Sequence, residues 1–265
     1  MNGTLFKKGL AGLWKFLVVF MAILTLYITM IVAMYDPEMS KMLEEFSKAM
    51  PQLMSAVGMS GDSSTLLGFM NTYLYGFILL VFPMVFSMLC SYQLMAKYLE
   101  RGSMASLLAA PVSRSTVVLT QMGVLFVMLV VLLGYATGLE VASAAWFFPG
   151  ELELGLLLRM NLGLFCLQLF IGALCFLCCC LFREPHHGVV ASVALPAVSF
   201  VLNMLSNVGE ETEKVGYASF FTLYDAGGLL AGEGSAWAGC ALLGVGALVF
   251  FALGTALFCR KDLSL

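Results

Sequence analysis

Six long stretches of almost unbroken apolar residues alternate with more polar segments along the chain. They cover approximately residues 16–34, 66–95, 116–138, 154–182, 188–205 and 236–259. A bilayer core about 30 Å thick is crossed by roughly 20 helical residues, which rise about 1.5 Å each. The stretches are continuously apolar and lack the in–out alternation of barrel strands. Each stretch therefore predicts a membrane-spanning helix.

The lengths and prolines of these stretches add detail to the spans. The stretches at 66–95 and 154–182 exceed the minimum length, so we expect them to tilt, bend or project beyond the lipid. Pro83 and Pro196 predict bends, because each proline removes one backbone hydrogen bond. The first stretch follows three lysines, as a signal peptide does. It is too long and has no small-residue cleavage site after it, so we expect a retained span.

Two of the polar segments are amphipathic. Residues 1–15 mix leucines and Trp14 with lysines, which predicts an interfacial helix. In residues 35–65, methionine, leucine and phenylalanine recur at helical spacing between charged residues. This pattern predicts an amphipathic helix at the outer interface, interrupted near Pro51. It either caps the bundle, which is the interpretation we favour, or contacts a substrate through its methionines.

The composition agrees with a chain that crosses a membrane several times. Of the 265 residues, 61% are hydrophobic and 11% are charged, and the mean hydropathy is +0.98. Soluble domains have about 45–50% apolar and about 25% charged residues. The balance excludes a water-soluble globular enzyme and a disordered chain. There is no basic block and no basic stripe with interleaved aromatic residues, so we expect no nucleic-acid partner.

The charged residues divide unevenly between two sets of polar segments. One set has nine basic and three acidic residues: the N-terminus, 96–115, 183–187 and the C-terminus. The other set has four basic and thirteen acidic residues: 35–65, 139–153 with Arg159, and 206–235. The positive-inside rule predicts that the first set faces the cytoplasm. We therefore expect a multi-pass protein of the cell (plasma) membrane with both termini in the cytoplasm.

The predicted spans contain almost no ionisable residue. Only Arg159 comes near, at the outer start of the fourth span, where snorkelling explains it. A charge inside a span marks an ion path or a proton relay, so a proton- or sodium-coupled carrier is disfavoured. An intramembrane enzyme is disfavoured too, because no predicted span holds a histidine and the paired carboxylates Glu210 and Glu211 fall in an outer segment.

Candidate metal and nucleotide sites are weak. All eight cysteines lie in or at the edge of predicted spans, so no disulfide framework is expected. The consecutive thiols of residues 178–180 point about 100° apart on a helix and cannot converge on one ion, so we expect small packing side chains. His186 and His187 are expected in a solvated turn. The chain has no Gly-x-x-x-x-Gly-Lys-Ser/Thr run, so we expect no bound cofactor and no ATP hydrolysis by that route.

The inner loop at residues 96–115 is the most informative segment. Gly102 breaks the preceding helix and Ser103 is a good N-cap for a new one. One apolar face then collects Met104, Leu107, Leu108 and Pro111. Pro111 ends this short helix, because the residue before a proline is pushed towards an extended conformation. Spacing alone leaves two uses open: the helix lies on the lipid surface, or it fits a groove on a soluble partner.

This loop resembles the cytoplasmic coupling loop of ABC type-two (ABC-2) permeases, the membrane subunits of many bacterial export transporters. That family typically has an acidic-Gly stretch followed by a Leu-Leu-small-small-Pro-Val-Ser-Arg run. Here the matching residues are Glu-Arg-Gly at 100–102 and Leu-Leu-Ala-Ala-Pro-Val-Ser-Arg at 107–114. The ending at 258–263 is similar to the family's aromatic-basic-basic-Asp-Leu ending, and 219–224 is a weaker match.

The resemblance implies an all-α fold of six transmembrane helices, with residues 1–265 as a single transmembrane domain. Residues 1–15 would be the interfacial elbow helix of the family, and 206–235 would include short re-entrant or interfacial helices at the outer face. Residues 103–110 would be a coupling helix that docks on a separate ATPase. The contact residues implied for that subunit are Glu100, Arg101, Gly102, Ser103, Met104, Leu107, Leu108, Pro111 and Arg114.

The function implied is that of a permease subunit in an ATP-driven exporter of a peptide, lipid-like or amphipathic drug-like substrate. Its partners would be two copies of an ABC ATPase, which bind the ATP and magnesium, and a second permease chain, identical or related. The chain itself would not be an enzyme. The alternatives are a non-ABC membrane assembly or scaffold protein and, less favoured, an intramembrane enzyme. An ATPase that co-purifies with the chain would discriminate between them.

Overall fold

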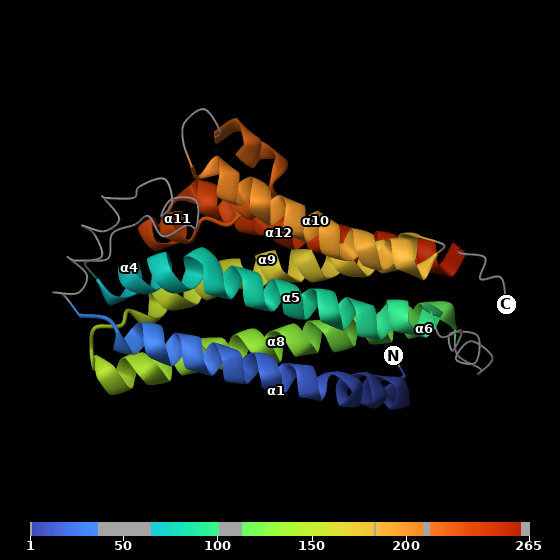
Figure 1. Cartoon of the computed structure of the whole chain (residues 1–265), viewed down its shortest axis with the longest axis horizontal. Helices are drawn as coiled ribbons and strands as arrows, with labels where there is room; N and C mark the ends of the chain where they lie inside the picture. The colour runs from blue at the N-terminus through green and yellow to red at the C-terminus, as the bar shows by residue number, and fades with distance from the viewer. Residues whose placement is uncertain (1, 37–64, 101–112, 183, 209–212, 261–265) are drawn as a thin grey trace.

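All six apolar stretches form long helices, and the predicted all-α, six-span fold is confirmed (Figure 1). The computed structural model describes residues 2–36, 65–100, 113–182, 184–208 and 213–260, and every regular element in these ranges is helical. Five spans are single helices: α1 (Gly3–Ala33), α8 (Arg114–Phe147), α9 (Leu154–Leu181), α10 (Pro185–Ser206) and α12 (Gly234–Arg260). The second span joins α4 (Leu66–Met70), η1 (Asn71–Ile78), α5 (Leu79–Ser91), η2 (Tyr92–Ala96) and α6 (Lys97–Glu100).

The first helix begins and the last helix ends at the same end of the bundle (Figure 1). The end of α6, the start of α8 and the start of α10 lie there as well. We call this the terminal end and the opposite one the distal end. Three short helices follow α10 at the distal end: η3 (Glu213–Ala218), η4 (Phe220–Leu223) and α11 (Ala226–Ala231). Six alternating spans thus bring both ends of the chain to one side.

Helix α9 is the centre of the bundle. It packs against α5, α8, α10, α11 and α12, whereas α1 packs mainly on α8. In lipid this packing comes from close van der Waals contact and polar contacts, because apolar lipid tails remove the hydrophobic driving force between helices. A close approach is visible at Gly163 of α9, where an added Cβ would lie 2.5 Å from Leu229 Cδ1 and 3.0 Å from Tyr224 Cε2. The lack of a side chain at Gly163 thus leaves the space that Leu229 of α11 occupies.

A neighbouring helix supplies a hydrogen-bond donor to the backbone near the proline of the second span. Pro83 lies inside α5 and has no N–H to donate to the carbonyl of Leu79, four residues earlier. The side chain of Gln168, on α9, donates from Nε2 to the carbonyl oxygens of Leu79 (3.2 Å) and Leu80 (3.0 Å). An unpartnered carbonyl in the hydrocarbon region is costly, so this contact stabilises the proline-containing helix and ties it to α9.

The segment predicted as an elbow is continuous with the first span. Helix α1 runs from Gly3 to Ala33 without a break, and Asn2 caps it by accepting hydrogen bonds from the N–H groups of Thr4 (3.0 Å) and Leu5 (3.3 Å). The N–H of Asn2 donates to Thr120 Oγ1 of α8 (3.0 Å). The interfacial placement of these residues stays a prediction. The amphipathic insertion predicted at 35–65 lies almost wholly outside the described residues.

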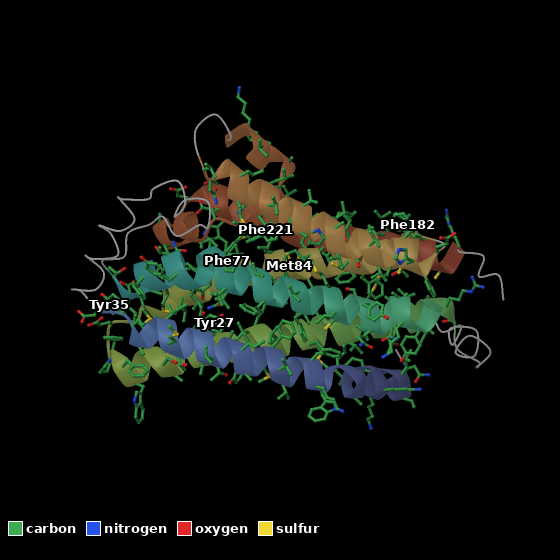
Figure 2. The ribbon with its side chains drawn as sticks, viewed as in Figure 1. Tyr27, Tyr35, Phe77, Met84, Phe182 and Phe221 are labelled. Carbon is green, nitrogen blue, oxygen red and sulfur yellow. The ribbon has the colours of Figure 1, made fainter. Side chains whose placement is uncertain are left out.

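Aromatic side chains join the short distal helices to the spans (Figure 2). Phe77 of η1 packs edge-on against Phe200 of α10, with ring centroids 5.8 Å apart. Phe200 packs in the same way against Phe221 of η4, at 5.4 Å. Offset and edge-to-face arrangements are the favourable geometries for aromatic rings. Phe200 of α10 thus contacts both the second span and η4, and these contacts shape the distal end.

Candidate functional site

The predicted coupling loop begins and ends at the terminal end of the bundle. Residues 101–112, and with them the helix predicted at 103–110, lie outside the described residues. Glu100 is the last residue of α6, and Arg114 is the first residue of α8. Ser113 caps α8 by accepting a hydrogen bond from the N–H of Thr116 (3.3 Å). The contact residues implied between 101 and 111 therefore stay predictions.

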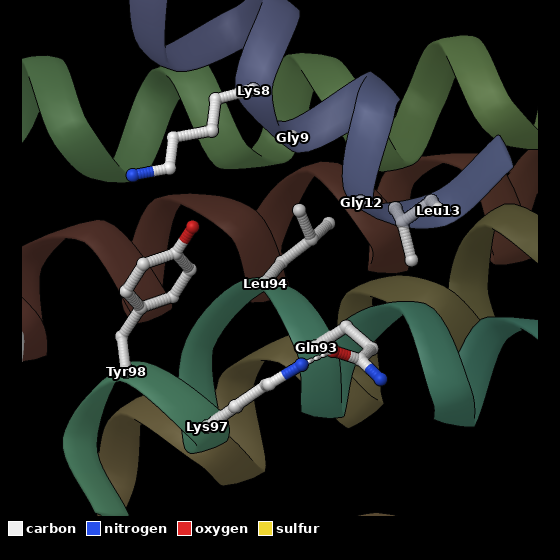
Figure 3. A pocket seen from close by; sticks show the side chains of 8 residues that line it. All are labelled: Lys8, Gly9, Gly12, Leu13, Gln93, Leu94, Lys97 and Tyr98. Atoms are coloured by element: carbon white, nitrogen blue, oxygen red, sulfur yellow. Dashed lines mark hydrogen bonds between the residues drawn. The ribbon is translucent and has the colours of Figure 1, made fainter. Parts of the chain in front are cut away.

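A cavity of about 340 Å³ lies at the terminal end, between α1 and the segment η2–α6 (Figure 3). We call it the terminal pocket. Its lining residues are Lys8, Gly9, Gly12, Leu13, Gln93, Leu94, Lys97 and Tyr98. Figure 3 shows Lys8 reaching down from α1 and Tyr98 rising from α6 on the same side of the cavity. The pocket thus adjoins the helix that leads directly into the predicted coupling loop.

The terminal pocket combines a basic rim with an apolar wall. Lys8 is exposed and Lys97 is half-buried, whereas Leu13 and Leu94 are buried. Lys97 Nζ donates to Gln93 Oε1, one helical turn earlier, at 2.6 Å. Among the eight lining residues there is no aspartate or glutamate. The pocket is therefore positively charged and lacks an internal carboxylate to neutralise it.

A second cavity, of about 430 Å³, lies at the distal end, and we call it the distal pocket. It is lined by Asn71, Tyr75, Gly76, Leu80, Asn203, Asn207, Phe221, Thr222, Tyr224, Asp225, Ala226 and Gly227. Asp225 is the one charged residue of this lining, and its Oδ1 accepts a hydrogen bond from the Gly228 N–H (2.9 Å). This pocket is therefore polar and acidic, whereas the terminal pocket is basic.

Behind the wall of the distal pocket, three helices share a buried carboxyl group. Tyr75 Oη of η1 donates to Glu140 Oε2 of α8 (3.0 Å), and Asn161 Nδ2 of α9 donates to the same oxygen (2.8 Å). Glu140 is fully buried. Within the described residues, Glu140 Oε1 and Asn161 Oδ1 have no hydrogen-bond partner. We call Tyr75, Glu140 and Asn161 the carboxyl cluster.

Tyr224 extends the carboxyl cluster towards the short distal helices. Its Oη donates to the carbonyl oxygen of Met160 on α9, at 3.4 Å. Burial raises the pKa of the Tyr224 phenol well above its ordinary value, and the nearby Glu140 carboxyl adds to the rise. The hydroxyl therefore stays neutral and remains a hydrogen-bond donor at physiological pH. Tyr75 and Tyr224 are both shared between the distal pocket and this buried region.

The position of Glu140 corrects a sequence-based expectation. The third span was predicted to end near Gly138, which placed Glu140 in an outer loop. Helix α8 instead continues to Phe147, and its outer part is buried at Glu140 and Ala144 by packing within the bundle. The expectation that Glu140 lies in an outer loop is therefore wrong, because it is a buried residue of the helix that forms the third span. The signal in the sequence was the apolar stretch Val141–Ala145 after the glutamate, which continues the helix.

Two π-helical segments of the second span contribute lining residues, one segment to each pocket. Segment η1 contributes Asn71, Tyr75 and Gly76 to the distal pocket, and η2 contributes Gln93 and Leu94 to the terminal pocket. A π-helix is wider than an α-helix and is found mostly as short insertions at functional sites. No signal in the sequence predicted these two segments.

None of the remaining candidate residues lines either pocket. Cys178, Cys179 and Cys180 are all buried in α9, and all eight cysteines are free thiols. His186 and His187 are exposed in the first turn of α10, rather than in the turn expected before the fifth span. His187 Nδ1 lies 3.2 Å from Glu184 Oε2 at the terminal end. Arg159 is exposed in the second turn of α9.

Comparison with protein families decides the membership of the chain. The model of the ABC-2 family transporter proteins matches residues 6–263. The chain belongs to the ABC-2 transporter family. No curated protein and no solved structure matches it. ABC-2 family permeases work with ABC ATPase partners in general.

The family match covers the segments that line both pockets of this ABC-2 protein. The match includes both π-helical segments, the carboxyl cluster and the loop between α6 and α8. The terminal pocket is lined in part by α6, which ends where that loop begins in the sequence, and the distal pocket is lined by the other end of the second span. The chain therefore has a basic cavity at one end, an acidic cavity at the other, and a sealed polar cluster beside the second.

Proposed function

We propose that the chain is the permease subunit of an ATP-driven exporter, powered by a separate ABC ATPase. The observation that carries this proposal is the ABC-2 family match over residues 6–263, together with six spans whose two ends lie on one side. Basic residues gather at this terminal end, among them Lys7, Lys8, Lys97, Arg114 and Arg260. By the positive-inside rule, this distribution supports a cytoplasmic position for the terminal end, where an ATPase would be accessible.

The loop at 101–112 is the proposed site of coupling. It connects α6 to α8, so a force on it acts on two spans at once. Met104, Leu107 and Leu108 would fill a groove on the ATPase, and Glu100, Arg101 and Arg114 would form the polar rim of that contact. Closure of two ATPase copies on ATP would move this element and rock the spans as rigid bodies. Two permease chains, identical or related, would complete the transporter.

The distal pocket is the proposed exit region for cargo. It combines amide and hydroxyl groups with Leu80 and Phe221, which suits a molecule with both polar and apolar parts. A peptide, a lipid-like molecule or an amphipathic drug-like molecule has this character. Many apolar side chains of α10 and α12 are also exposed on the outside of the bundle, where lipid or the second permease chain would cover them.

The test is co-purification and transport with the ABC ATPase encoded nearest to the gene. Leu107→Asp with Leu108→Asp places two charges on the predicted apolar face and is expected to abolish both ATPase capture and ATP-dependent transport. Ser106→Asp with Ala109→Asp adds the same charge on the opposite face and is expected to retain both. Capture and transport that persist in the first variant would show that the coupling role is wrong.

Glu140 favours a second candidate function, a cation-coupled carrier. A buried carboxyl group within a span is a frequent part of a proton or ion path. The two functions differ in their energy source. An exporter of the proposed kind loses transport when the ATPase is inactivated and keeps it when an uncoupler collapses the proton gradient. A cation-coupled carrier gives the reverse result.

A further inference from the structure

The terminal pocket has the chemistry of an anion site that neither the family nor the transport function assigns. Two lysines reach it from helices that are far apart in the sequence, Lys8 from α1 and Lys97 from α6. The lining has no acidic residue to neutralise them. Gln93 adds a side-chain amide that donates hydrogen bonds. Figure 3 shows Lys8 and Tyr98 on one side of the cavity, whereas Lys97 extends along its own helix to Gln93.

The partner of Lys97 indicates how the site is prepared for a ligand. Its ammonium group donates to the neutral amide oxygen of Gln93 at 2.6 Å. A neutral amide holds the lysine in place without neutralising its positive charge, and the described lining of the cavity holds no carboxylate. The other two donor hydrogens of the ammonium group remain oriented away from Gln93. The charge is thus positioned at the cavity before any ligand enters.

The rest of the cavity suits an amphipathic ligand. Leu13 and Leu94 are buried on its wall. Gly12 leaves the α1 side open, because a Cβ added there would meet no atom within 4 Å. Trp14 is half-exposed beside Leu13, a position typical of an aromatic residue at a membrane interface. A volume of about 340 Å³ is within the range of about 300–1,000 Å³ seen for small-molecule pockets.

We propose that the terminal pocket binds a phosphate-bearing anion, bridged by Lys8 and Lys97. Basic pockets between helices on the cytoplasmic side of membrane proteins hold anionic lipid head groups, and a lysine presents a compact point charge to phosphate. The phosphate comes either from an anionic phospholipid, whose chains lie along Leu13 and Leu94, or from a soluble phosphate. The occupant ties α1 to α6, the helix that leads into residues 101–112.

The site can be tested without any assumption about transport. The full chain, purified in detergent with whatever partner remains bound, is titrated with phosphatidylglycerol, with phosphatidylcholine and with glycerol 3-phosphate, and bound molecules are counted by native mass spectrometry. Phosphatidylglycerol is expected to bind more tightly than phosphatidylcholine. Lys8→Gln with Lys97→Gln is expected to weaken its binding about fivefold per lysine, or about 25-fold in total.

Matched variants separate the pocket from a general effect of charge. Lys15→Gln, on the same helix but outside the pocket, with Lys214→Gln at the distal end, removes the same charge and is expected to leave binding unchanged. Lys8→Arg with Lys97→Arg keeps the charge and is expected to retain binding. Thermal unfolding without lipid shows whether each variant is folded. If the double glutamine variant does not fold, the double arginine variant and the two single glutamine variants test whether binding depends on the lysines.

Each outcome has a defined meaning. Lysine-dependent binding of phosphatidylglycerol, with little binding of glycerol 3-phosphate, supports the proposal and identifies a lipid as the source. Equal lysine-dependent binding of phosphatidylglycerol and glycerol 3-phosphate supports the proposal and shows that a soluble phosphate is sufficient for binding. Two results would overturn the proposal. One is equally tight binding of phosphatidylcholine and the anionic ligands. The other is an equal loss of binding in the Lys15→Gln with Lys214→Gln control.

Discussion

The two pockets lie at opposite ends of the second span, and they hold charge in opposite ways. In the terminal pocket, Lys8 and Lys97 carry their charge at an accessible rim. Beside the distal pocket, the carboxyl group of Glu140 is sealed behind Tyr75 and bonded to side chains of two other helices. An accessible charge selects a ligand, whereas a sealed one mainly fixes the relative position of the helices around it.

The space around one glycine also differs between the two ends of the bundle. At the distal end the backbone of α12 approaches the carbonyl oxygen of Leu223 so closely at Gly239 that no side chain fits between them. At the terminal pocket, Gly12 has open space where a side chain would begin. The difference teaches that the contact at Gly239 is filled, whereas the terminal pocket has room for a guest beside Gly12.

The largest loss of stability is expected when a side chain is added at Gly239, where α12 contacts the carbonyl oxygen of Leu223. Gly239→Ala forces its Cβ against a backbone oxygen, and overpacking of this kind costs about 1–3 kcal/mol. Gly12→Ala adds the same methyl group in open space and is expected to leave stability unchanged or to raise it, because alanine favours a helix. Thermal unfolding of the two purified variants measures the difference. Equal stability of both would remove the contrast between the ends.

The next effect is expected in the carboxyl cluster. Asn161→Leu removes one of the two donors to Glu140 Oε2 and is expected to lower stability by about 1–2 kcal/mol. Glu140→Gln keeps an oxygen for both donors and supplies an amide that can donate to Asn161, so it is expected to unfold near the wild-type temperature. A leucine variant as stable as the wild type would show that the cluster contributes nothing to helix packing.

A smaller effect is expected where Gln168 supports the proline-containing helix. Gln168→Leu leaves the carbonyls of Leu79 and Leu80 without their side-chain donor and is expected to cost about 1 kcal/mol. The loss should shrink when Pro83→Ala is present, since the new N–H then serves Leu79. A double-mutant cycle of thermal stability measures this coupling. Additive losses would mean that Gln168 acts independently of the proline.

The smallest effect is expected at the rim of the terminal pocket. Lys97→Gln removes an accessible charge and a single hydrogen bond to Gln93, so in lipid-free detergent its stability should change by less than about 0.5 kcal/mol. The measurement is thermal unfolding beside the Asn161→Leu variant. A loss as large as that of Asn161→Leu would show that the lysine is part of the packing and not of a ligand site.

Much of the fold could be predicted from the sequence, because a bilayer leaves few alternatives to a continuous apolar helix. The six spans and the return of both ends to one side followed from stretch length and number. The end of α8 could not be predicted in the same way. A glutamate near the predicted end at Gly138 suggested a loop, and only the donors Tyr75 and Asn161, distant in sequence, explain its burial.

The pockets were less predictable than the spans. The lysines near the N-terminus suggested contact with anionic lipid, but Lys97 was expected only as part of the inner loop. Their meeting depends on how α1 lies against the segment η2–α6, which no local pattern encodes. The π-helical segments depend likewise on the packing around them. The coupling residues stay predictions from the motif at 100–114.

The central claim is that residues 103–110 transmit force from an ATPase to the spans. The most direct measurement places a photo-crosslinking amino acid at Leu107 in the assembled transporter and identifies the adduct by mass spectrometry. The account predicts a covalent adduct with the ATPase subunit, and a much weaker one from the same probe at Ser106. Adducts formed only with lipid, or equal adducts from both positions, would contradict it.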